Sequence, residues 1–369
     1  SVLQLTRAGL HVLNQHGPVS PLPRQLWVSK RVTQWDVARL AGVSRATVSN
    51  VITDRSGGAV PISEETRRRV LAAVAELGYR PDAGARSLRS GRSRTVGLVI
   101  PDAANPHFWS VVRGVEEAVR LQGCQLVLTF TALDPERERQ SLHALAERRM
   151  DGLILMLTYP GRVRSEVEAL RLRGSAIVAL GGTLPGHDAV FHSYAAGAAA
   201  LMGHLLQLGH RRIAFIHGTA RPGLGADRLQ EYRRALHAAD LPVEQRWIAR
   251  CGTSLDEGVA AARALLSCEP RPTAVVGVND LMAIGALQAA AQLSLRVPAD
   301  LSVAGFDDIE LAAHTVPPLT TVSAGGEEAG RAAAELLFAR LREPERLPCR
   351  VERPTQLVIR ESTGPCPAE

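Results

Sequence analysis

The sequence predicts a chain of two parts: a small all-α head, and a longer α/β region of two doubly wound parallel sheets. Three observations predict this fold class. Two short helical stripes of apolar residues flank Gly42. Between Lys30 and Arg94, 13 basic and 6 acidic side chains leave a charge of +7. From Thr95 onward, continuous apolar runs alternate with helical stretches rich in alanine and leucine, which is typical of parallel sheets covered by helices.

The head is predicted to begin with two short helices separated by a turn. Thr33 and Ser44 each stand where a side-chain oxygen can cap the start of a helix. Gly42 stands where the first helix must end, because glycine takes the left-handed conformation at little cost. Each helix has an apolar stripe that can pack against the other: Val37, Leu40 and Ala41 in the first, and Val48, Val51 and Ile52 in the second.

This pair of helices fits a helix-turn-helix, in which the second helix enters the major groove of DNA by its N-terminal end. Arg45 and Ala46 would face base edges there, with Asn50 one turn further on. Arginine can bind guanine through two hydrogen bonds, and alanine can contact a thymine methyl group. Taken alone, the pattern also fits two amphipathic core helices with a solvated polar face.

A third helix is predicted from Ser63 to Leu77, and basic residues follow it. Several phrases across this region form a specific set: Asp36-Val37-Ala38, Ala41-Gly42-Val43-Ser44, Ala46-Thr47-Val48-Ser49, Glu64-Glu65-Thr66-Arg67, Leu77-Gly78-Tyr79-Arg80-Pro81 and Ala85-Arg86-Ser87-Leu88. On these phrases, the sequence from Val32 to Thr363 resembles the LacI/GalR family of bacterial transcription factors. The resemblance implies a repressor that binds a pseudopalindromic operator in double-stranded DNA as a homodimer.

The resemblance also implies which residues of the head contact DNA. Residues 81–94 match a hinge helix that orders on operator DNA, and Leu88 matches a leucine that wedges into a minor-groove step. Two departures are present: Gly84 weakens that short helix, and the loop 54–62 is longer than the family's usual form. The implied DNA-binding residues are Thr33, Ser44, Arg45, Ala46, Thr47, Ser49, Asn50, Thr66, Ala85 and Leu88.

The α/β region is predicted to form two subdomains, because its strand-like runs outnumber those of one comfortable sheet. The runs are 96–100, 125–130, 152–157, 176–180, 189–192, 212–216, 247–250, 274–278, 301–304 and 356–360. The resemblance implies the architecture of periplasmic binding proteins, in which the chain passes between subdomains three times, here near Ser193, Val322 and Arg350. The predicted domains are an extension (1–31), the head (32–80), the hinge (81–94) and an effector-binding domain (95–364), divided into 95–193 with 323–350 and 194–322 with 351–364.

Open parallel sheets bind ligands at the carboxyl ends of their strands. By position in the resemblance, Asp280 matches a carboxylate that binds effector hydroxyls, and Arg228 matches an arginine that reaches the effector from the opposite side. His107 and Phe108 match positions that line the same cleft. These matches imply a small-molecule effector, a sugar or sugar derivative. Asp307, which ends a neighbouring run, is expected to cap or brace structure instead.

The effector region departs from the family's usual residues at several positions. His192-Ser193-Tyr194 replaces a more usual acidic phrase, and Thr253 falls where several members have an aromatic stacking residue. Glu231 stands in place of a usual glycine, and Gly325-Gly326 stands where others have ligand-binding side chains. The predicted pocket therefore lacks some of the common sugar-stacking groups.

Other classes of protein fit the sequence less well. A solute-binding receptor of a transport system would explain the sheets but not the helix-turn-helix, and no export signal is visible. An enzyme is not expected, because Gly223-Leu224-Gly225 lacks the lysine of a phosphate loop, and no catalytic set, cofactor motif or metal-ligand spacing is present. Five scattered cysteines fit a reduced cytoplasm, and no run approaches the roughly 18 apolar residues of a membrane span. Residues 1–31 fit a disordered extension or a misplaced start.

Overall fold

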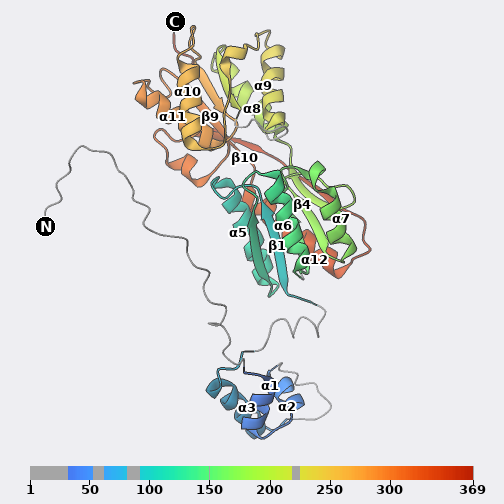
Figure 1. Ribbon diagram of the computed structural model, residues 1–369. Coiled ribbons are helices and arrows are strands. Elements are labelled where there is room, and N and C mark those ends of the chain that lie inside the picture. The colour runs from blue at the N-terminus through green and yellow to red at the C-terminus, as the bar shows by residue number, and fades with distance from the viewer. Residues whose placement is uncertain (1–31, 53–61, 81–91, 149, 218–224, 369) are drawn as a thin grey trace, which may run out of the picture. The chain divides into compact units, whose positions relative to one another are not determined.

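The computed structural model describes residues 32–52, 62–80, 92–148, 150–217 and 225–368. The chain divides into two compact units, Ser1–Arg86 and Ser87–Glu369 (Figure 1). The predicted N-terminal extension, the loop 53–61 and most of the predicted hinge lie outside the described residues.

The head consists of three helices, α1 (Gln34–Ala41), α2 (Arg45–Ile52) and α3 (Glu64–Glu76). They bury a small shared core made of Val37, Ala38, Ala41, Val48, Val51, Val70, Ala73 and Tyr79. Leu40, which the periodicity places on the buried stripe of α1, is 47% exposed, and Ala38 takes its place in the core. The core is therefore built mostly from small and β-branched side chains, which let short helices approach closely.

The ends of these helices follow the capping residues in the sequence. Gly42 ends α1 in the left-handed conformation, with φ of 63°. Ser44 and Ser63 accept backbone N–H groups from the first turns of α2 and α3, at 3.1 and 3.3 Å. At α1 the roles differ from the prediction, because the N–H and the hydroxyl of Thr33 both donate to the carboxylate of Asp36, at 2.9 and 2.7 Å.

The first sheet of the larger unit is parallel throughout, with strand order β11-β5-β4-β3-β1-β2. Successive residues of β1 point to opposite faces: Val96 and Leu98 enter the core beneath α5 and α12, and Val99 enters the core beneath α6 and α7. The strands are β1 (Thr95–Ile100), β2 (Gln125–Phe130), β3 (Gly152–Leu155), β4 (Ala176–Leu180), β5 (Asp188–His192) and β11 (Arg350–Arg353). The helices are α5 (His107–Leu121), α6 (Pro135–Glu147), η2 (Pro160–Arg162), α7 (Arg164–Leu172) and α12 (Gly326–Arg342).

The second sheet has strand order β12-β10-β9-β8-β6-β7, in which only the β10–β12 pair is antiparallel. Its strands are β6 (Ile213–His217), β7 (Ile248–Arg250), β8 (Ala274–Gly277), β9 (Ser302–Asp307), β10 (Thr320–Ser323) and β12 (Gln356–Val358). Its helices are α8 (Tyr194–Gln207), α9 (Ala226–Ala238), η3 (Gln245–Trp247), α10 (Leu255–Leu266), α11 (Asp280–Gln292) and η4 (Glu310–His314).

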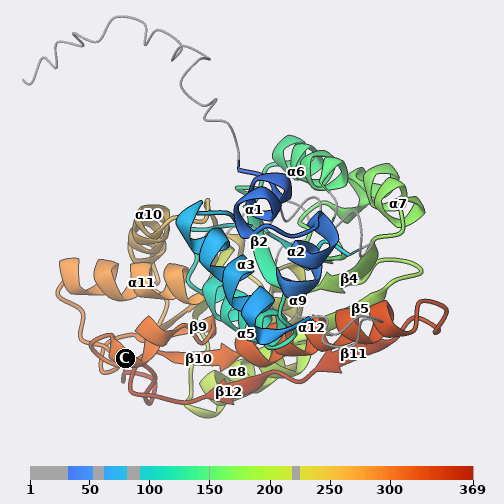
Figure 2. The same cartoon turned by 90° about the horizontal axis from the view of Figure 1, so that it is seen from below.

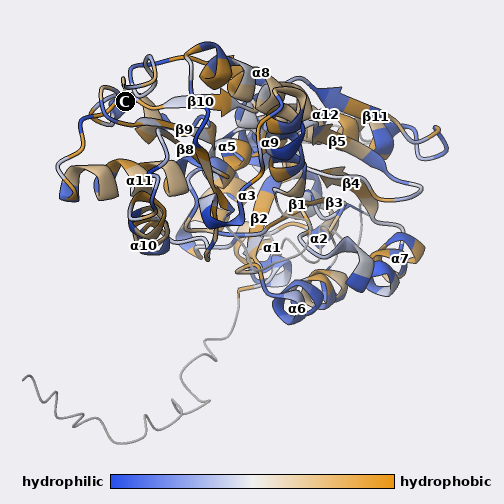
Figure 3. Cartoon of the chain, turned by 90° about the horizontal axis from the view of Figure 1, so that it is seen from above, coloured by the Kyte–Doolittle hydropathy of each residue, from blue (hydrophilic) through white to orange (hydrophobic). Residues whose placement is uncertain are grey.

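Outer helices such as α6 and α7, which cover the first sheet, carry both hydrophilic and hydrophobic residues (Figure 3), as expected of helices that cover a sheet.

The chain passes between the two sheets three times. The first passage follows β5 at Ser193, the second follows β10 at residues 324–325, and the third lies between β11 and β12 at residues 354–355. The third passage comes later than the predicted position near Arg350, because β11 pairs with β5 of the first sheet. Thr355 joins two passages: its hydroxyl donates to the carbonyl of Ser193 and accepts the N–H of Gly197, each at 3.1 Å.

Helices α5 and α12 lie side by side over the first sheet (Figure 2) and touch through their backbones. A Cβ atom at Gly114 would lie 1.9 Å from the carbonyl oxygen of Glu327, and one at Gly330 would lie 2.2 Å from that of Val111. This close packing fixes the position of α5, and with it the position of His107 at its N-terminal end.

Candidate functional site

The N-terminal end of α2 forms the surface that is predicted to contact DNA. Because Ser44 caps this helix, Arg45 and Ala46 are exposed in its first turn, and Asn50 is exposed one turn later. The guanidinium of Arg45 lies 5.6 Å from the ring centre of Trp35, which is 63% exposed at the start of α1. A cation at this distance from an indole is attracted to the ring face, so Trp35 restrains the side chain that is predicted to contact bases.

The other predicted DNA-binding residues lie around this surface or outside the described residues. Thr47 and Ser49 are half-buried on α2, and Thr33 is exposed just before α1. Thr66 lies in the first turn of α3, where its hydroxyl accepts a hydrogen bond from Ser63 at 3.0 Å. All of these DNA contacts stay predictions, and Ala85 and Leu88 fall outside the described residues.

Polar side chains from both sheets meet at the carboxyl ends of their strands. We call this group the strand-end cluster: it consists of Asn105, His107, His192, Tyr194, His217, Arg228 and Asp307. Asn105 and His107 follow β1, His192 ends β5 and His217 ends β6. Parallel strands place their carboxyl ends at one edge of each sheet, which is why residues so far apart in sequence come together.

Asp307 is the centre of this cluster, although sequence reasoning assigned it a bracing role. It ends β9 with φ of 104°, a strained conformation for a residue other than glycine. Its carboxylate receives the hydroxyl of Tyr194 at 3.4 Å, a guanidinium nitrogen of Arg228 at 3.5 Å, and the side-chain amide of Asn105 at 3.5 Å. Asn105 belongs to the part of the chain around the first sheet, so the Asn105–Asp307 contact links the two sheets.

Arg228 is held in place beside Asp307 by two aromatic rings. Its guanidinium carbon lies 3.7 Å from the ring centre of Tyr194 and 5.1 Å from that of Phe306. One terminal nitrogen donates to the backbone carbonyl of Val278 at 2.6 Å. Burial raises the pKa of Tyr194, so its hydroxyl keeps its proton and can donate to Asp307. These contacts fix the guanidinium near the strand ends while its Nε–H is left without a partner in the described part of the chain.

Asp280 has surroundings different from those we expected of an effector ligand. It is fully buried at the first position of α11. Its two carboxylate oxygens accept the N–H of Ile309 at 2.8 Å and the hydroxyl of Thr321 at 2.5 Å. Burial, and then the negative charge of Asp307, raise the pKa of Asp280 well above the usual range. One oxygen braces the segment after Asp307 and the other braces β10, so an effector contact by Asp280 stays a prediction that this geometry does not favour.

His107 and Phe108 begin α5, at positions fixed by the chain that enters the helix. The N–H of His107 donates to the side-chain oxygen of Asn105 at 3.0 Å. The rings of His107 and Phe108 meet edge to face, with centroids 5.3 Å apart. The structure thus brings His107 into the strand-end cluster with Arg228, while its predicted contact with an effector remains to be tested.

Several buried polar atoms at these strand ends have no hydrogen-bond partner among the described residues. They are His107 Nδ1, Thr158 Oγ1, His192 Nε2, His217 Nδ1 and Arg228 Nε. Buried polar atoms are nearly always paired in folded proteins, because an unpaired one costs about 1–3 kcal/mol. Two further unpaired atoms in the described residues belong to Arg346, away from these strand ends. The strand ends therefore have hydrogen-bonding groups that the described residues leave unused.

The two histidines that end strands are electrically neutral in this setting. Burial lowers the pKa of His192 to about 4, and the nearby His107 and Arg353 act in the same direction. Burial, followed by Arg250, lowers the pKa of His217. Sequence reasoning noted His192 only as a departure from an acidic phrase and did not select His217. The signal that could have found both is their place at, or directly after, the last residue of a predicted strand.

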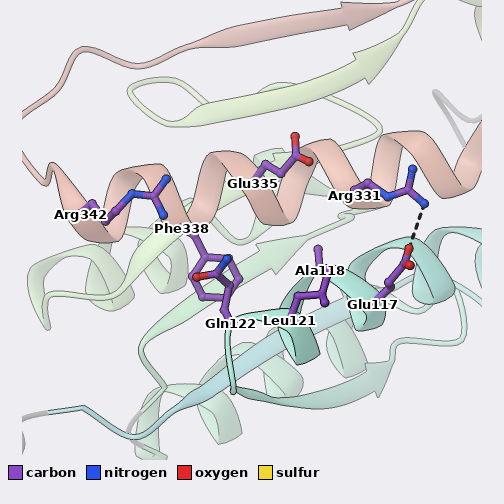
Figure 4. Close-up of a pocket in the computed structure, with 8 residues that line it drawn as sticks. All are labelled: Glu117, Ala118, Leu121, Gln122, Arg331, Glu335, Phe338 and Arg342. Atoms are coloured by element: carbon purple, nitrogen blue, oxygen red, sulfur yellow. Dashed lines mark hydrogen bonds and ion pairs between the residues drawn. The ribbon is translucent and has the colours of Figure 1, made fainter.

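A separate hollow lies along α5 and α12, lined by Glu117, Ala118, Leu121, Gln122, Arg331, Glu335, Phe338 and Arg342 (Figure 4). Glu117 and Arg331 form an ion pair of 2.9 Å across it. Glu117 is ten residues beyond His107 along α5, about 15 Å at the rise of an α-helix. This hollow is therefore distinct from the strand-end cluster.

Three further properties concern possible metal binding, membrane spanning and disulfide bonding in the described part of the chain. Within it, no three His, Cys, Asp or Glu side chains are grouped so that they could hold a metal ion. None of its helices has the length and apolar character needed to cross a membrane. All five cysteines lie in this part, and each is a free thiol.

Comparisons with known proteins agree with both regions. Residues 33–82 match the bacterial regulatory proteins of the lacI family, and residues 202–363 match a periplasmic binding protein-like domain. The ribose operon repressor of Haemophilus influenzae is 37% identical over 331 residues, which are 89% of this chain and 98% of that protein. The HTH-type transcriptional repressor PurR of Vibrio vulnificus is 34% identical over 328 residues, 89% of this chain and 97% of that protein.

Two solved structures share the fold. The lac repressor dimer bound to operator and the anti-inducer ONPF superposes with a TM-score of 0.79 at 28% identity, covering 91% of this chain and 100% of that one. A complex of the transcriptional regulator CelR with cellobiose gives a TM-score of 0.65 at 33% identity, covering 90% of this chain and 100% of that one.

Fold and sites together define a helix-turn-helix transcription regulator with a periplasmic-binding-protein-like domain. The chain belongs to the lacI family of bacterial regulatory proteins, and it is a DNA-binding regulator rather than an enzyme.

Proposed function

We propose that this protein is a repressor that binds a pseudopalindromic operator as a homodimer and is controlled by a carbohydrate effector at the strand-end cluster. We also propose that it acts in the cytoplasm, where its DNA target lies. The observation that carries the proposal is the polar contact of Asp307 with both Arg228 and Asn105. It places a charged, incompletely paired group where the two sheets meet, in a chain that also carries a DNA-binding head.

In the operator complex, the N-terminal turn of α2 enters the major groove. Arg45 donates to a guanine edge, Ala46 contacts a thymine methyl group, and Asn50 contacts the bases one turn further on. The helix starts at Thr33 and Thr66 lie where backbone N–H groups and hydroxyls can meet phosphates. In a symmetric dimer, two such heads meet half-sites about one helical turn apart.

At the effector site, Asp307 rather than Asp280 is the carboxylate that meets ligand hydroxyls. A carboxylate can accept two neighbouring hydroxyls, and the Nε–H of Arg228 can donate to a third oxygen. His107 and Phe108 approach from α5, on the side of the first sheet. Two proteins of the comparison support a sugar: the ribose operon repressor by its name, and the regulator CelR by its bound cellobiose.

The contact between Asn105 and Asp307 supplies a way for the effector to change the protein. An effector that takes over Asp307 releases or replaces a contact between the two sheets, and so shifts their relative positions. Such coupling is reciprocal, because operator binding must then change effector affinity by the same factor.

A binding assay with the chain's own upstream DNA tests the proposal. The full-length protein is titrated against the promoter fragment and against a scrambled duplex of equal length, at one fixed salt concentration. We expect a preference of at least about a thousandfold for the promoter fragment, and a loss of that preference in Arg45→Ala. Equal affinity for both duplexes, with or without added sugars, would contradict the repressor function.

A further inference from the structure

Tyr194 contacts both Arg228 and Asp307 from a position where the chain passes between the two sheets. It is the first residue of α8, directly after the passage at Ser193. The centre of its ring lies 3.7 Å from the guanidinium carbon of Arg228, and its hydroxyl donates to the carboxylate of Asp307 at 3.4 Å. An atom so near the ring centre lies over the face of the ring, because a position in the ring plane would overlap the ring atoms. Tyr194 therefore covers one flat side of the guanidinium.

This contact restrains Arg228 without using any of its hydrogen-bond donors. An arginine side chain has several rotatable bonds, and its N–H groups all lie in the plane of the guanidinium. One terminal nitrogen of Arg228 donates to the carbonyl of Val278 at 2.6 Å, and the other lies at a long 3.5 Å from Asp307. A ring against the flat side limits the tilt of this plane, so the unpaired Nε–H keeps one direction.

The main chain that carries Tyr194 is itself fixed where the passages meet. The carbonyl of Ser193 accepts the hydroxyl of Thr355, and the oxygen of that hydroxyl accepts the N–H of Gly197, each at 3.1 Å. A Cβ atom at Gly197 would lie 2.4 Å from a methyl carbon of Val322 in β10. The first turn of α8 is thus held on both sides of Tyr194, which makes its ring a fixed support for a flexible cation.

The ring of Tyr194, rather than its hydroxyl, provides this support. The hydroxyl bond to Asp307 is 3.4 Å long, which is beyond the usual range for a hydroxyl donor. The ring also meets the ring of Phe306 edge to face, with centroids 6.1 Å apart, and the guanidinium carbon of Arg228 lies 5.1 Å from that second ring. A phenylalanine at position 194 would keep these ring contacts, whereas a leucine would not.

We propose that Tyr194 is a positioning residue for the effector. Its ring orders the guanidinium of Arg228 in advance, so that the Nε–H meets an acceptor oxygen of the effector without a further loss of side-chain freedom. A hydroxyl or ring oxygen of a sugar is such an acceptor. Tyr194 acts on the effector only through Arg228. The inference rests on the proposed function, since it concerns the effector of the same site.

The test uses the full-length protein with D-ribose, D-glucose and cellobiose as probes. Thermal shift finds the sugar that binds best, and calorimetry measures its Kd for the wild type and each variant. Tyr194→Leu should weaken sugar binding about 3- to 10-fold, the factor expected when one arginine side chain must be ordered at the moment of binding. Tyr194→Phe, which keeps the ring, should stay within about twofold of the wild type. If Tyr194→Leu does not fold, Tyr194→Met, whose flexible side chain can fill the space of the ring, takes its place.

A double-mutant cycle with Arg228→Met separates positioning from a direct contact. Methionine is a long side chain without an N–H group. In this background, Tyr194→Leu should change Kd by less than about twofold, because the group that Tyr194 orders is gone. Weak binding in this background is measured by thermal shift at high sugar concentration, since a bound ligand stabilises the fold by mass action.

Tyr232→Phe is the matched control for a general loss of stability. It removes a buried hydrogen bond of 2.8 Å to the carbonyl of Ile213, one turn beyond Arg228 on the same helix. It should lower the free energy of unfolding in urea while sugar affinity stays within about twofold of the wild type. A loss of affinity as large as that of Tyr194→Leu would attribute both results to a weakened fold and would overturn the inference.

Three further outcomes overturn the inference and leave the proposed function standing. One is a Tyr194→Leu variant that binds the sugar as the wild type does. Another is an equal loss in Tyr194→Phe, which would assign the effect to the hydroxyl. The third is the same loss in the Arg228→Met background, which would mean that Tyr194 acts independently of Arg228. If no probe binds the wild type, the carbohydrate part of the proposed function fails together with the inference, while specific operator binding would still support the repressor.

Discussion

Replacing each of two aspartates by alanine separates structural bracing from effector binding. Asp280 is fully buried, and its oxygens hold the N–H of Ile309 and the hydroxyl of Thr321. Asp280→Ala leaves both of these buried groups unpaired, at about 1–3 kcal/mol each, so we expect a loss of roughly 2–6 kcal/mol in the free energy of unfolding. At about 2–4 °C per kcal/mol for a domain of this size, Tm should fall by at least about 4 °C.

Asp307→Ala should differ chiefly in its effect on effector binding. Its contacts are 3.4–3.5 Å long, but their loss leaves the buried guanidinium of Arg228 without a carboxylate, so we expect a loss of at least about 1–3 kcal/mol in the free energy of unfolding. If its carboxylate accepts effector hydroxyls, the loss of charge-assisted hydrogen bonds of about 1.5–3 kcal/mol weakens effector binding roughly 10- to 100-fold.

Two measurements on the same preparations show which aspartate braces the fold and which binds the effector. They are urea unfolding followed by circular dichroism, and calorimetric titration with the best-binding sugar. Asp280→Ala should be less stable but, where folded, should bind the sugar within about threefold of the wild type. An Asp280→Ala variant of normal stability that no longer binds the sugar would show that our assignment of the two carboxylates is reversed.

Three further predictions concern pH, base readout and packing. Because the pKa of Asp280 is raised in the folded state by burial, its stabilising effect is full below the usual carboxyl range and declines as pH rises through the raised pKa; Asp280→Asn should therefore flatten the slope of unfolding free energy against pH above the usual carboxyl range. Arg45→Ala should relax base preference at one position per half-site in a selected-sequence profile, and Trp35→Ala should weaken binding without moving that position; an unchanged Arg45→Ala profile would exclude base readout. Gly114→Ala puts a Cβ 1.9 Å from a carbonyl oxygen of α12 and should cost about 1–3 kcal/mol or more in urea unfolding, whereas Gly203→Ala, which meets nothing within 4 Å, should stabilise α8 by roughly 0.5–1 kcal/mol; equal effects would refute the packing argument.

The strands that sequence could predict are those with continuous apolar runs. Such runs are buried on both faces of a parallel sheet, and β1, β4 and β6 follow them closely. Strand β11 is not predicted by hydrophobicity, because Arg350–Arg353 contains one apolar residue, Val351. Its place is set by backbone pairing with β5, through partners such as Arg350 and Ala189, and hydrophobicity carries no sign of that pairing. The same omission moved the predicted third passage of the chain.

The site was predictable in location but not in the roles of its carboxylates. Both Asp280 and Asp307 follow apolar runs, so sequence places both near strand ends. What separates them is tertiary: β9 continues through Gly305, where a Cβ would lie 2.4 Å from an oxygen of Asp280. In the sequence, Gly305 indicates the end of a strand. In the structure, its missing side chain leaves space for the buried carboxylate of Asp280. Because β9 passes so close to Asp280, that carboxylate is buried beneath the strand. Asp307, at the end of the same strand, lies in the strand-end cluster instead.

The histidines could not be selected for a related reason. His192 and His217 each end a strand that reads as apolar and buried, and a histidine there is equally compatible with a paired core residue. Only the hydrogen-bonding partners in the folded chain show that one ring nitrogen of each histidine is left without a partner in the described residues. Arg228, by contrast, is predicted from its position in the family resemblance, and its stacking on Tyr194 gives the physical reason for its place in the structure.

The reciprocal titration tests ligand-controlled operator binding most directly. Kd for the promoter fragment is measured with and without saturating effector, and Kd for the effector is measured with and without saturating promoter fragment, at one salt concentration. We expect the two ratios to be equal and between about 5 and 150. A ratio of one in both directions, with each ligand bound tightly, would mean that the two sites are independent and that the effector does not control the head.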